Sequence, residues 1–297
     1  MRTSWKIGTA FGIGIYVHIT FLLLPMYVLY ENGTQAGLPV IGFMMALLAA
    51  LFGCVVLHEL GHALMARHFG IGTRDITLYP IGGVARLEGM GKRPIQELCI
   101  ALAGPAVNVV IAALLGVLII PMISLTGMAH ASAHVGALGP YPVQDFLVQL
   151  MVLNVLMVLF NLIPAFPMDG GRVLRSLLAM NLGQVRATVI AAHVGTFFAL
   201  LMVLACFKYP DYGSPFLIFV ALFIWFAGRQ ELYGMRMRER LRRAEPIDVL
   251  PADDNMEYAL TPPREPHYSG YTWNERLHAW VLWRDGRAVA AFSVPAE

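Results

Sequence analysis

The stretch VVLHELGHALMARH, residues 55–68, decides how the rest of the chain is interpreted. It continues a long apolar run, yet it brings His58, Glu59 and His62 together within five residues. On an α-helix, residues four apart share one face, so the two imidazoles can occupy two corners of a tetrahedral zinc site. Glu59 lies about 100° around the helix, where its carboxylate can reach a water molecule without being a ligand. The pattern is typical of a metallopeptidase helix in which the glutamate is the general base.

The alternative interpretation of this stretch is a histidine pair whose hydrogen bonds are satisfied inside a helical bundle. Ionisable side chains within a membrane span cost about 2.5–3.5 kcal/mol each on insertion scales, and they usually mark function. Bundle packing gives no reason for three of them in five residues. We therefore expect a metal site.

The composition predicts a membrane protein. Of the 297 residues, 58% are hydrophobic and 13% are charged, whereas an ordinary globular domain carries about 25% charged residues. Several apolar runs are long enough to cross a bilayer. The formal net charge of +2, without a basic patch, argues against a nucleic-acid partner. Three isolated cysteines form neither a disulfide framework nor a cysteine zinc site.

The apolar runs predict an all-α polytopic protein with about six transmembrane helices, at residues 9–30, 38–67, 97–120, 144–164, 186–207 and 214–233. The intervening loops at 31–37 and 121–143 contain no lysine or arginine, whereas the opposite side carries many, including Arg172 and Arg175. Because basic residues favour the cytoplasmic side, we expect both termini in the cytoplasm and His58 in the cytoplasmic half of a cell membrane.

A catalytic zinc site needs a third protein ligand, and Asp169 is the candidate. It lies in FNLIPAFPMDGGRVLR, residues 160–175, at the cytoplasmic end of a predicted span. Two prolines and two glycines interrupt the helix there, and such a backbone is tolerated at membrane depth only where protein buries it or water reaches it. The alternative role for Asp169 is to cap the helix that follows. Asn108, in ALAGPAVN, is assigned to contacts between helices.

Two segments are too polar to span. Residues 74–89, RDITLYPIGGVARLEG, predict a short membrane-associated β-hairpin or an extended loop. Residues 244–297 predict a small α+β cytoplasmic extension, with a hairpin turn at Asp285–Gly286. The expected domains are therefore a transmembrane metalloprotease domain at 1–243 and the extension at 244–297.

Four motifs, HELGH, YPIGGVARLEG, ALAGPAVN and NLIPAFPMDGGR, occur in this order and resemble the site-2 protease family of intramembrane zinc metalloproteases. The resemblance covers roughly residues 1–232. It implies that His58, His62 and Asp169 bind one zinc ion and that Glu59 activates water. The sequence has PAFPMDG where the shortest family motif is Asn-Pro-Asp-Gly, so the role of Asn161 is less direct than that of Asp169.

The implied substrate is a single-span membrane protein in the lipid bilayer. A transmembrane helix must unwind before attack, because its carbonyls are held in internal hydrogen bonds. An extended peptide can then pair with a strand edge, for which LYPIGGVARL, with Gly82 and Gly83, is the candidate; a plain connecting loop is the alternative. Asn161 is expected to contact the substrate or to support its loop.

Two other functions fit parts of the sequence. One is a different HExxH membrane peptidase whose third ligand is a downstream glutamate. The other is a non-catalytic, zinc-stabilised protein that binds a membrane client or transports an ion; Glu59 argues against it, because holding zinc does not require that carboxylate. The sequence does not specify the oligomeric state.

Overall fold

The computed structural model describes residues 3–32, 37–89, 93–126, 142–208, 215–243, 246–247, 270–275 and 279–293. The chain divides into two compact units, Met1–Glu231 and Leu232–Glu297. The division falls inside helix α7, Pro215–Arg243. The first unit carries the predicted metal site, and each unit is described by itself below.

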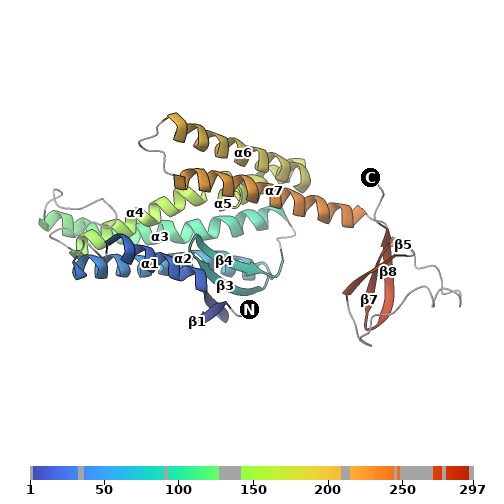
Figure 1. Cartoon of the computed structure of the whole chain (residues 1–297), viewed down its shortest axis with the longest axis horizontal. Coiled ribbons are helices and arrows are strands. Elements are labelled where there is room, and N and C mark those ends of the chain that lie inside the picture. The colour runs from blue at the N-terminus through green and yellow to red at the C-terminus, as the bar shows by residue number, and fades with distance from the viewer. Residues whose placement is uncertain are drawn as a thin grey trace. The chain divides into compact units, whose positions relative to one another are not determined.

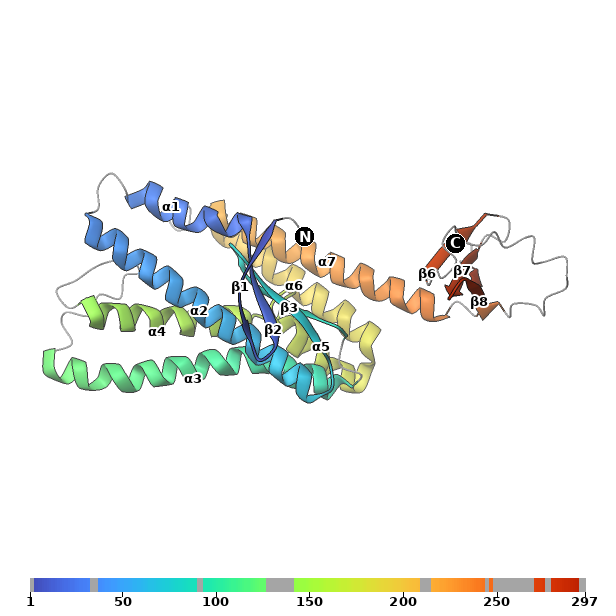
Figure 2. The same cartoon turned by 90° about the horizontal axis from the view of Figure 1, so that it is seen from below.

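The first unit contains four helices that are long and apolar enough to cross a membrane, among the residues described. They are α2 (Leu38–His68), α3 (Pro94–Thr126), α4 (Pro142–Asn161) and α6 (Gln184–Lys208). Figures 1 and 2 show α2, α3 and α4 running alongside one another. These four helices match four of the six predicted spans. Residues 215–233 of the predicted span at 214–233 lie in α7, which is helical but is not one of the four, and residue 214 lies outside the described residues.

The predicted transmembrane helix at residues 9–30 is wrong. The segment instead contains the end of strand β1 (Ser4–Ala10), strand β2 (Ile13–His18), a 3-10 helix, η1 (Ile19–Leu22), and most of α1 (Leu23–Asn32). Phe11 and Gly12 have φ values of 52° and 83°, the geometry of a tight hairpin turn between paired strands. The stretch is apolar overall, but its β-branched residues alternate, and Ile13 and Ile15 turn inward. Mean hydropathy cannot distinguish this alternation from a span.

A four-stranded sheet with the order β1-β2-β3-β4 lies across α2 (Figure 2). Strands β3 (Thr73–Tyr79) and β4 (Gly82–Leu87) form within the segment expected as a hairpin or loop. β2 and β3 are parallel, and the other neighbours are antiparallel. Ile13 and Ile76 pack against Leu60 and Ala63 of α2 in one apolar cluster. The sheet is therefore anchored on the turns of α2 that carry the HELGH motif, and the fold is not purely helical.

The second unit contains a second sheet with the order β5-β8-β7-β6. Its strands are β5 (Pro246–Ile247), β6 (Gly270–Asn274), β7 (Ala279–Arg284) and β8 (Arg287–Ser293). β7 and β8 join at Asp285–Gly286, where both φ values are positive. Val281 and Trp283 form its buried side. The described residues beyond 243 are strands and turns, where we expected a mixed α+β extension.

Helices α2 and α3 approach closely at Gly61. A Cβ atom on Gly61 would lie 2.8 Å from the Ala103 carbonyl oxygen and 2.9 Å from the Val107 Cγ2 atom. Gly53, two turns earlier on α2, would meet nothing within 4 Å. The short distance between α2 and α3 therefore requires glycine, which has no side chain, at position 61.

We predict that Gly61→Ala lowers the free energy of unfolding by about 1–3 kcal/mol, because α3 must move away. Gly53→Ala is the matched control and should leave stability unchanged or slightly raised, because alanine favours a helix more than glycine does. Thermal unfolding of the purified protein in detergent checks both variants. Equal melting temperatures for the two variants would contradict the close approach.

Candidate metal centre

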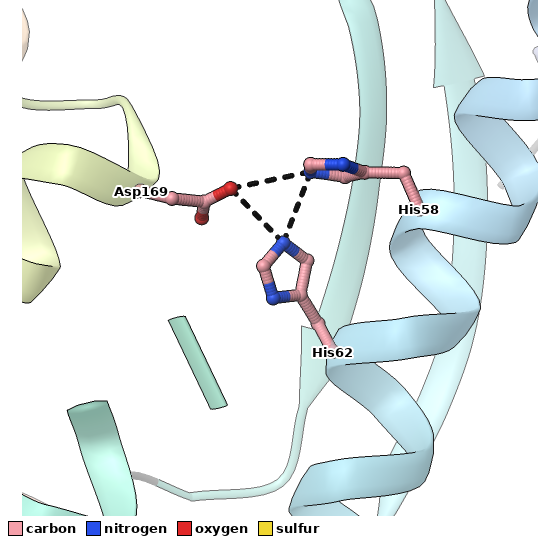
Figure 3. Close-up of side chains that lie close together, drawn as sticks. All are labelled: His58, His62 and Asp169. Atoms are coloured by element: carbon pink, nitrogen blue, oxygen red, sulfur yellow. Dashed lines mark hydrogen bonds and ion pairs between the residues drawn. The ribbon is translucent and has the colours of Figure 1, made fainter. Parts of the chain in front are cut away.

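Three side chains from two separated parts of the chain converge in the first unit (Figure 3). His58 and His62 project from α2, and Asp169 is the first residue of α5, Asp169–Leu182. The Asp169 Oδ2 atom lies 3.2 Å from His58 Nε2 and 3.1 Å from His62 Nε2. The two Nε2 atoms are 3.1 Å apart. All three residues are buried, so the predicted ligands do meet at one point.

Backbone hydrogen bonds and glycines hold the turn that presents Asp169. After α4 ends at Asn161, the Ala165 carbonyl accepts a hydrogen bond from the Met168 amide. A Cβ atom on Gly170 would lie 2.3 Å from the carbonyl oxygens of Leu162 and Ile163, so only glycine lets α5 start against this turn. The N-cap of α5 is Met168, and the carboxylate of Asp169 lies against the two imidazoles instead. The helix-capping alternative for Asp169 is therefore not what the structure shows.

Hydrogen bonds on the far side of each imidazole fix its orientation. His62 Nδ1 donates to the Ile100 carbonyl at 2.7 Å, and His58 Nδ1 donates to Asn108 Oδ1 at 3.0 Å. When the imidazoles are neutral, both Nε2 atoms therefore direct lone pairs toward the carboxylate oxygen of Asp169. Three acceptor atoms this close repel one another unless a cation lies between them.

The geometry and chemistry of the three donors fit zinc. Zn–N and Zn–O bonds of about 2.0–2.2 Å place tetrahedral ligand atoms about 3.3 Å apart, close to the separations observed here. Two imidazoles and a carboxylate also form a common ligand set of catalytic zinc sites, and ligating histidines usually donate their second N–H to a carbonyl or carboxylate. Within the described ranges, no other set of three His, Cys, Asp or Glu side chains could hold an ion, so a glutamate as third ligand gains no support there.

Helix α3 supplies a wall and a support for the two histidines. A Cβ atom on Gly104 would lie 2.2 Å from His62 Nε2 and 2.8 Å from His58 Nε2. One turn later, Asn108 accepts from His58 and donates its Nδ2 to Asn154 Oδ1 of α4 at 3.2 Å. The sequence assigned Asn108 to contacts between helices, and it makes one, but its bond to His58 was missed. The spacing Gly-x-x-x-Asn was the available signal, because it places both residues on one helix face.

Glu59 lies against strand β4 rather than among the three converging atoms. Its Oε2 accepts a hydrogen bond from the Ala85 amide at 3.0 Å. A Cβ atom on Gly83 would lie 2.6 Å from the Glu59 Cγ atom. Glu59 is half-buried, beside two buried ligand candidates on the same helix. This position suits a group that exchanges a proton with water.

The structure places the remaining predicted residues less directly. Gly82 begins β4 with a φ of 135°, a backbone conformation that favours glycine over other residues. Gly83 packs on Glu59. Asn161 is the half-buried last residue of α4, and no hydrogen bond joins it to the three converging side chains.

Comparison with known proteins indicates the family to which the chain is similar. The family model described as peptidase family M50 matches residues 46–202. The zinc metalloprotease MJ0392 of Methanocaldococcus jannaschii is 37% identical over 84% of this chain. The putative zinc metalloproteases sll0528 of Synechocystis and Rip3 of Mycobacterium tuberculosis are 35% and 33% identical over 68% and 78% of it. The chain spans 67%, 52% and 59% of the lengths of these three relatives.

A solved structure is also similar. It is the site-2 protease from Methanocaldococcus jannaschii, with a TM-score of 0.52 and 34% sequence identity. The match covers 77% of this chain and 95% of that one. The likeness extends over most of the unit that contains the three converging side chains.

We predict that Asn108→Leu weakens zinc binding about 10–100-fold, because His58 loses the acceptor that holds its ring and tautomer. Asn108→Asp retains an oxygen acceptor at the same place and should retain more of the affinity. Competition with a chelator for zinc, on protein purified in detergent, measures both. Wild-type affinity in Asn108→Leu would show that the bond does not orient His58.

Proposed function

Because the chain belongs to peptidase family M50, the site-2 protease family of intramembrane zinc metalloproteases, we propose that it hydrolyses peptide bonds within or near transmembrane segments of membrane-protein substrates. The observation that carries the proposal is the convergence of His58, His62 and Asp169 beside the Glu59 carboxylate. A zinc-stabilised client-binding or transport protein is not favoured, because it gives no role to Glu59.

In the proposed mechanism, His58, His62 and Asp169 hold one zinc ion. When bound, the ion supplies Lewis-acid activation of a water molecule and of the scissile carbonyl. Glu59 takes the proton from the attacking water and returns it to the leaving amine. The Ala85 amide holds the Glu59 carboxylate against β4, on the same turn of α2 as His58 and His62.

The substrate is proposed to bind along β4. Within the sheet, β4 has β3 as its one neighbour among the described strands, so an extended peptide can pair with the main-chain groups of its outer edge, apart from the Ala85 amide that bonds to Glu59. Because the Ala85 amide of this strand bonds to Glu59, a peptide paired along β4 passes next to the general base. Gly82 and Gly83 keep the start of the strand free of side chains. Asn161, at the end of α4, is proposed to support or contact the unwound peptide.

The chain is a multi-pass membrane protein. We propose the cell membrane as its location, with both termini in the cytoplasm, because the basic residues of the sequence gather on one side of the predicted spans. The partner is a single-span membrane protein that diffuses laterally to the site. Residues 244–297 are proposed as a cytoplasmic extension outside the protease domain.

We predict that Glu59→Gln lowers cleavage of a tagged single-span membrane protein about 10²–10⁴-fold, because an amide cannot accept the proton from water. Zinc content should stay at the wild-type level, because Glu59 is not a ligand. Cleavage is measured by gel mobility, with metal content determined on the same samples. Glu275→Gln, an exposed glutamate of the second unit, is the matched control. Wild-type cleavage in Glu59→Gln would remove the general-base assignment.

We predict that a cysteine placed at Val84 of β4 forms disulfides with cysteines at alternate positions of a substrate segment. Side chains alternate along paired strands, so every second substrate position should react. The experiment uses the Glu59→Gln background, in which the uncleaved substrate persists. Ile7→Cys on β1, an exposed position at the opposite edge of the same sheet, is the control. Equal crosslinking from both edges would contradict binding along β4.

A further inference from the structure

Arg175 is a buried charge that the proposed mechanism does not use. Sequence reasoning counted it among the basic residues of the cytoplasmic side, but its exposed fraction is 2%. It lies on α5, the helix that begins with Asp169. A guanidinium that is buried away from water needs protein acceptors for its N–H groups. The neighbours of Arg175 therefore show which elements it connects.

Two carboxylates and one aromatic ring surround the guanidinium. Arg175 Nε donates to Glu97 Oε1 at 2.8 Å, and one terminal nitrogen donates to the same oxygen. The other terminal nitrogen forms an ion pair with Glu231 of α7. The guanidinium carbon lies 5.1 Å from the centre of the Phe166 ring. Arg175 thus connects the start of α3, the turn before α5, and α7.

The contacts of Arg175 with Glu97 and with Phe166 each involve a backbone segment that holds one of the proposed metal ligands. Glu97 is buried in the first turn of α3, one turn before Ile100, whose carbonyl accepts the hydrogen bond from His62. Phe166 belongs to the turn that presents Asp169, and it is also buried. Arg175 therefore fixes the backbone that orients His62 relative to the backbone that presents Asp169.

Apolar packing secures the same turn from another side. Ala165 and Met168 lie in one cluster with Ala199 of α6 and with Val220 and Ile224 of α7. Such contacts are not directional, so they hold the turn in place without fixing its exact register. The planar guanidinium, bonded from two sides and stacked on Phe166, adds that directional constraint.

A buried ion pair is a weak source of stability, because removing both charges from water offsets most of their attraction. Apolar side chains of similar size would stabilise these helices as well or better. The arrangement is therefore better explained by the geometry that it imposes than by stability alone.

We propose that Arg175 is a positioning residue for the metal centre, which sets the Asp169 carboxylate at bonding distance from the ion held by His58 and His62. The inference rests on the proposed zinc site. Glu97 and Phe166 transmit the constraint to the two ligand-bearing segments. Glu231 adds a second carboxylate from α7, and its side chain is about one-third exposed, at 32%.

The test measures metal binding by the full-length protein in detergent, without any substrate. In Arg175→Lys the charge remains, but the planar fork and the stacking on Phe166 are lost. In Glu97→Gln the shared acceptor is uncharged. We expect each variant to bind zinc about tenfold more weakly than the wild type in competition with a chelator. We also expect the visible absorption of the Co²⁺-loaded protein to shift, because its coordination geometry changes.

Ser176→Ala is the matched control. Ser176 is buried on the same helix, but among the described residues its hydroxyl bonds within α5 alone, to the Arg172 carbonyl. Its zinc affinity and Co²⁺ spectrum should equal those of the wild type. If Arg175→Lys or Glu97→Gln fails to fold, Phe166→Leu tests the same path, because it keeps apolar volume and removes the ring face.

Two results would overturn the proposal. In the first result, the Arg175→Lys and Glu97→Gln variants, or Phe166→Leu in their place, melt at a lower temperature than the wild type, but their zinc affinity changes by less than about twofold. In the second result, the visible spectra of the Co²⁺-loaded variants equal that of the Co²⁺-loaded wild type. If the wild type binds zinc and Asp169→Ala does not, either result removes only the role of Arg175. If zinc binding by the wild type does not depend on Asp169, the proposed function fails as well.

Discussion

The structure depends on the meeting of two imidazole nitrogens and one carboxylate oxygen at separations of 3.1–3.2 Å in a buried place. These atoms repel one another without a cation, so the helices that carry them must be held together by other contacts. Gly61 and Gly104 let α3 approach α2, and Gly170 lets α5 start against the turn after α4. The close approaches and the ligand set are therefore parts of one arrangement.

The N-terminal sheet lies beside this arrangement, and we propose that it binds the substrate. Its apolar residues pack on α2 beside the HELGH motif, and its strand β4 holds Glu59 through the Ala85 amide. Among the described strands β4 is an edge of the sheet, and we propose that a peptide pairs there. In the proposed function, one element therefore positions the general base and offers the main-chain groups that an unwound segment requires.

Local spacing could be predicted from the sequence, and partners distant in the chain could not. His58 and His62 follow from helical periodicity, and Asp169 follows from the proline and glycine break around it. The helix expected at 9–30 was wrong because mean hydropathy hides the alternation that makes β2. The bond between Asn108 and His58, and the burial of Arg175 between Glu97 and Glu231, depend on how helices pack. From residue type alone, Asn108 was assigned to contacts between helices, and Arg175 was counted among the basic residues of the cytoplasmic side.

X-ray absorption at the zinc edge tests the central claim most directly. On the purified wild-type protein we expect one zinc ion per chain, with nitrogen and oxygen ligands at about 2.0–2.2 Å and outer-shell scattering from two imidazoles. Asp169→Ala should lose that signal. A sulfur ligand at about 2.3 Å, or an unchanged spectrum in Asp169→Ala, would contradict a site made of His58, His62 and Asp169.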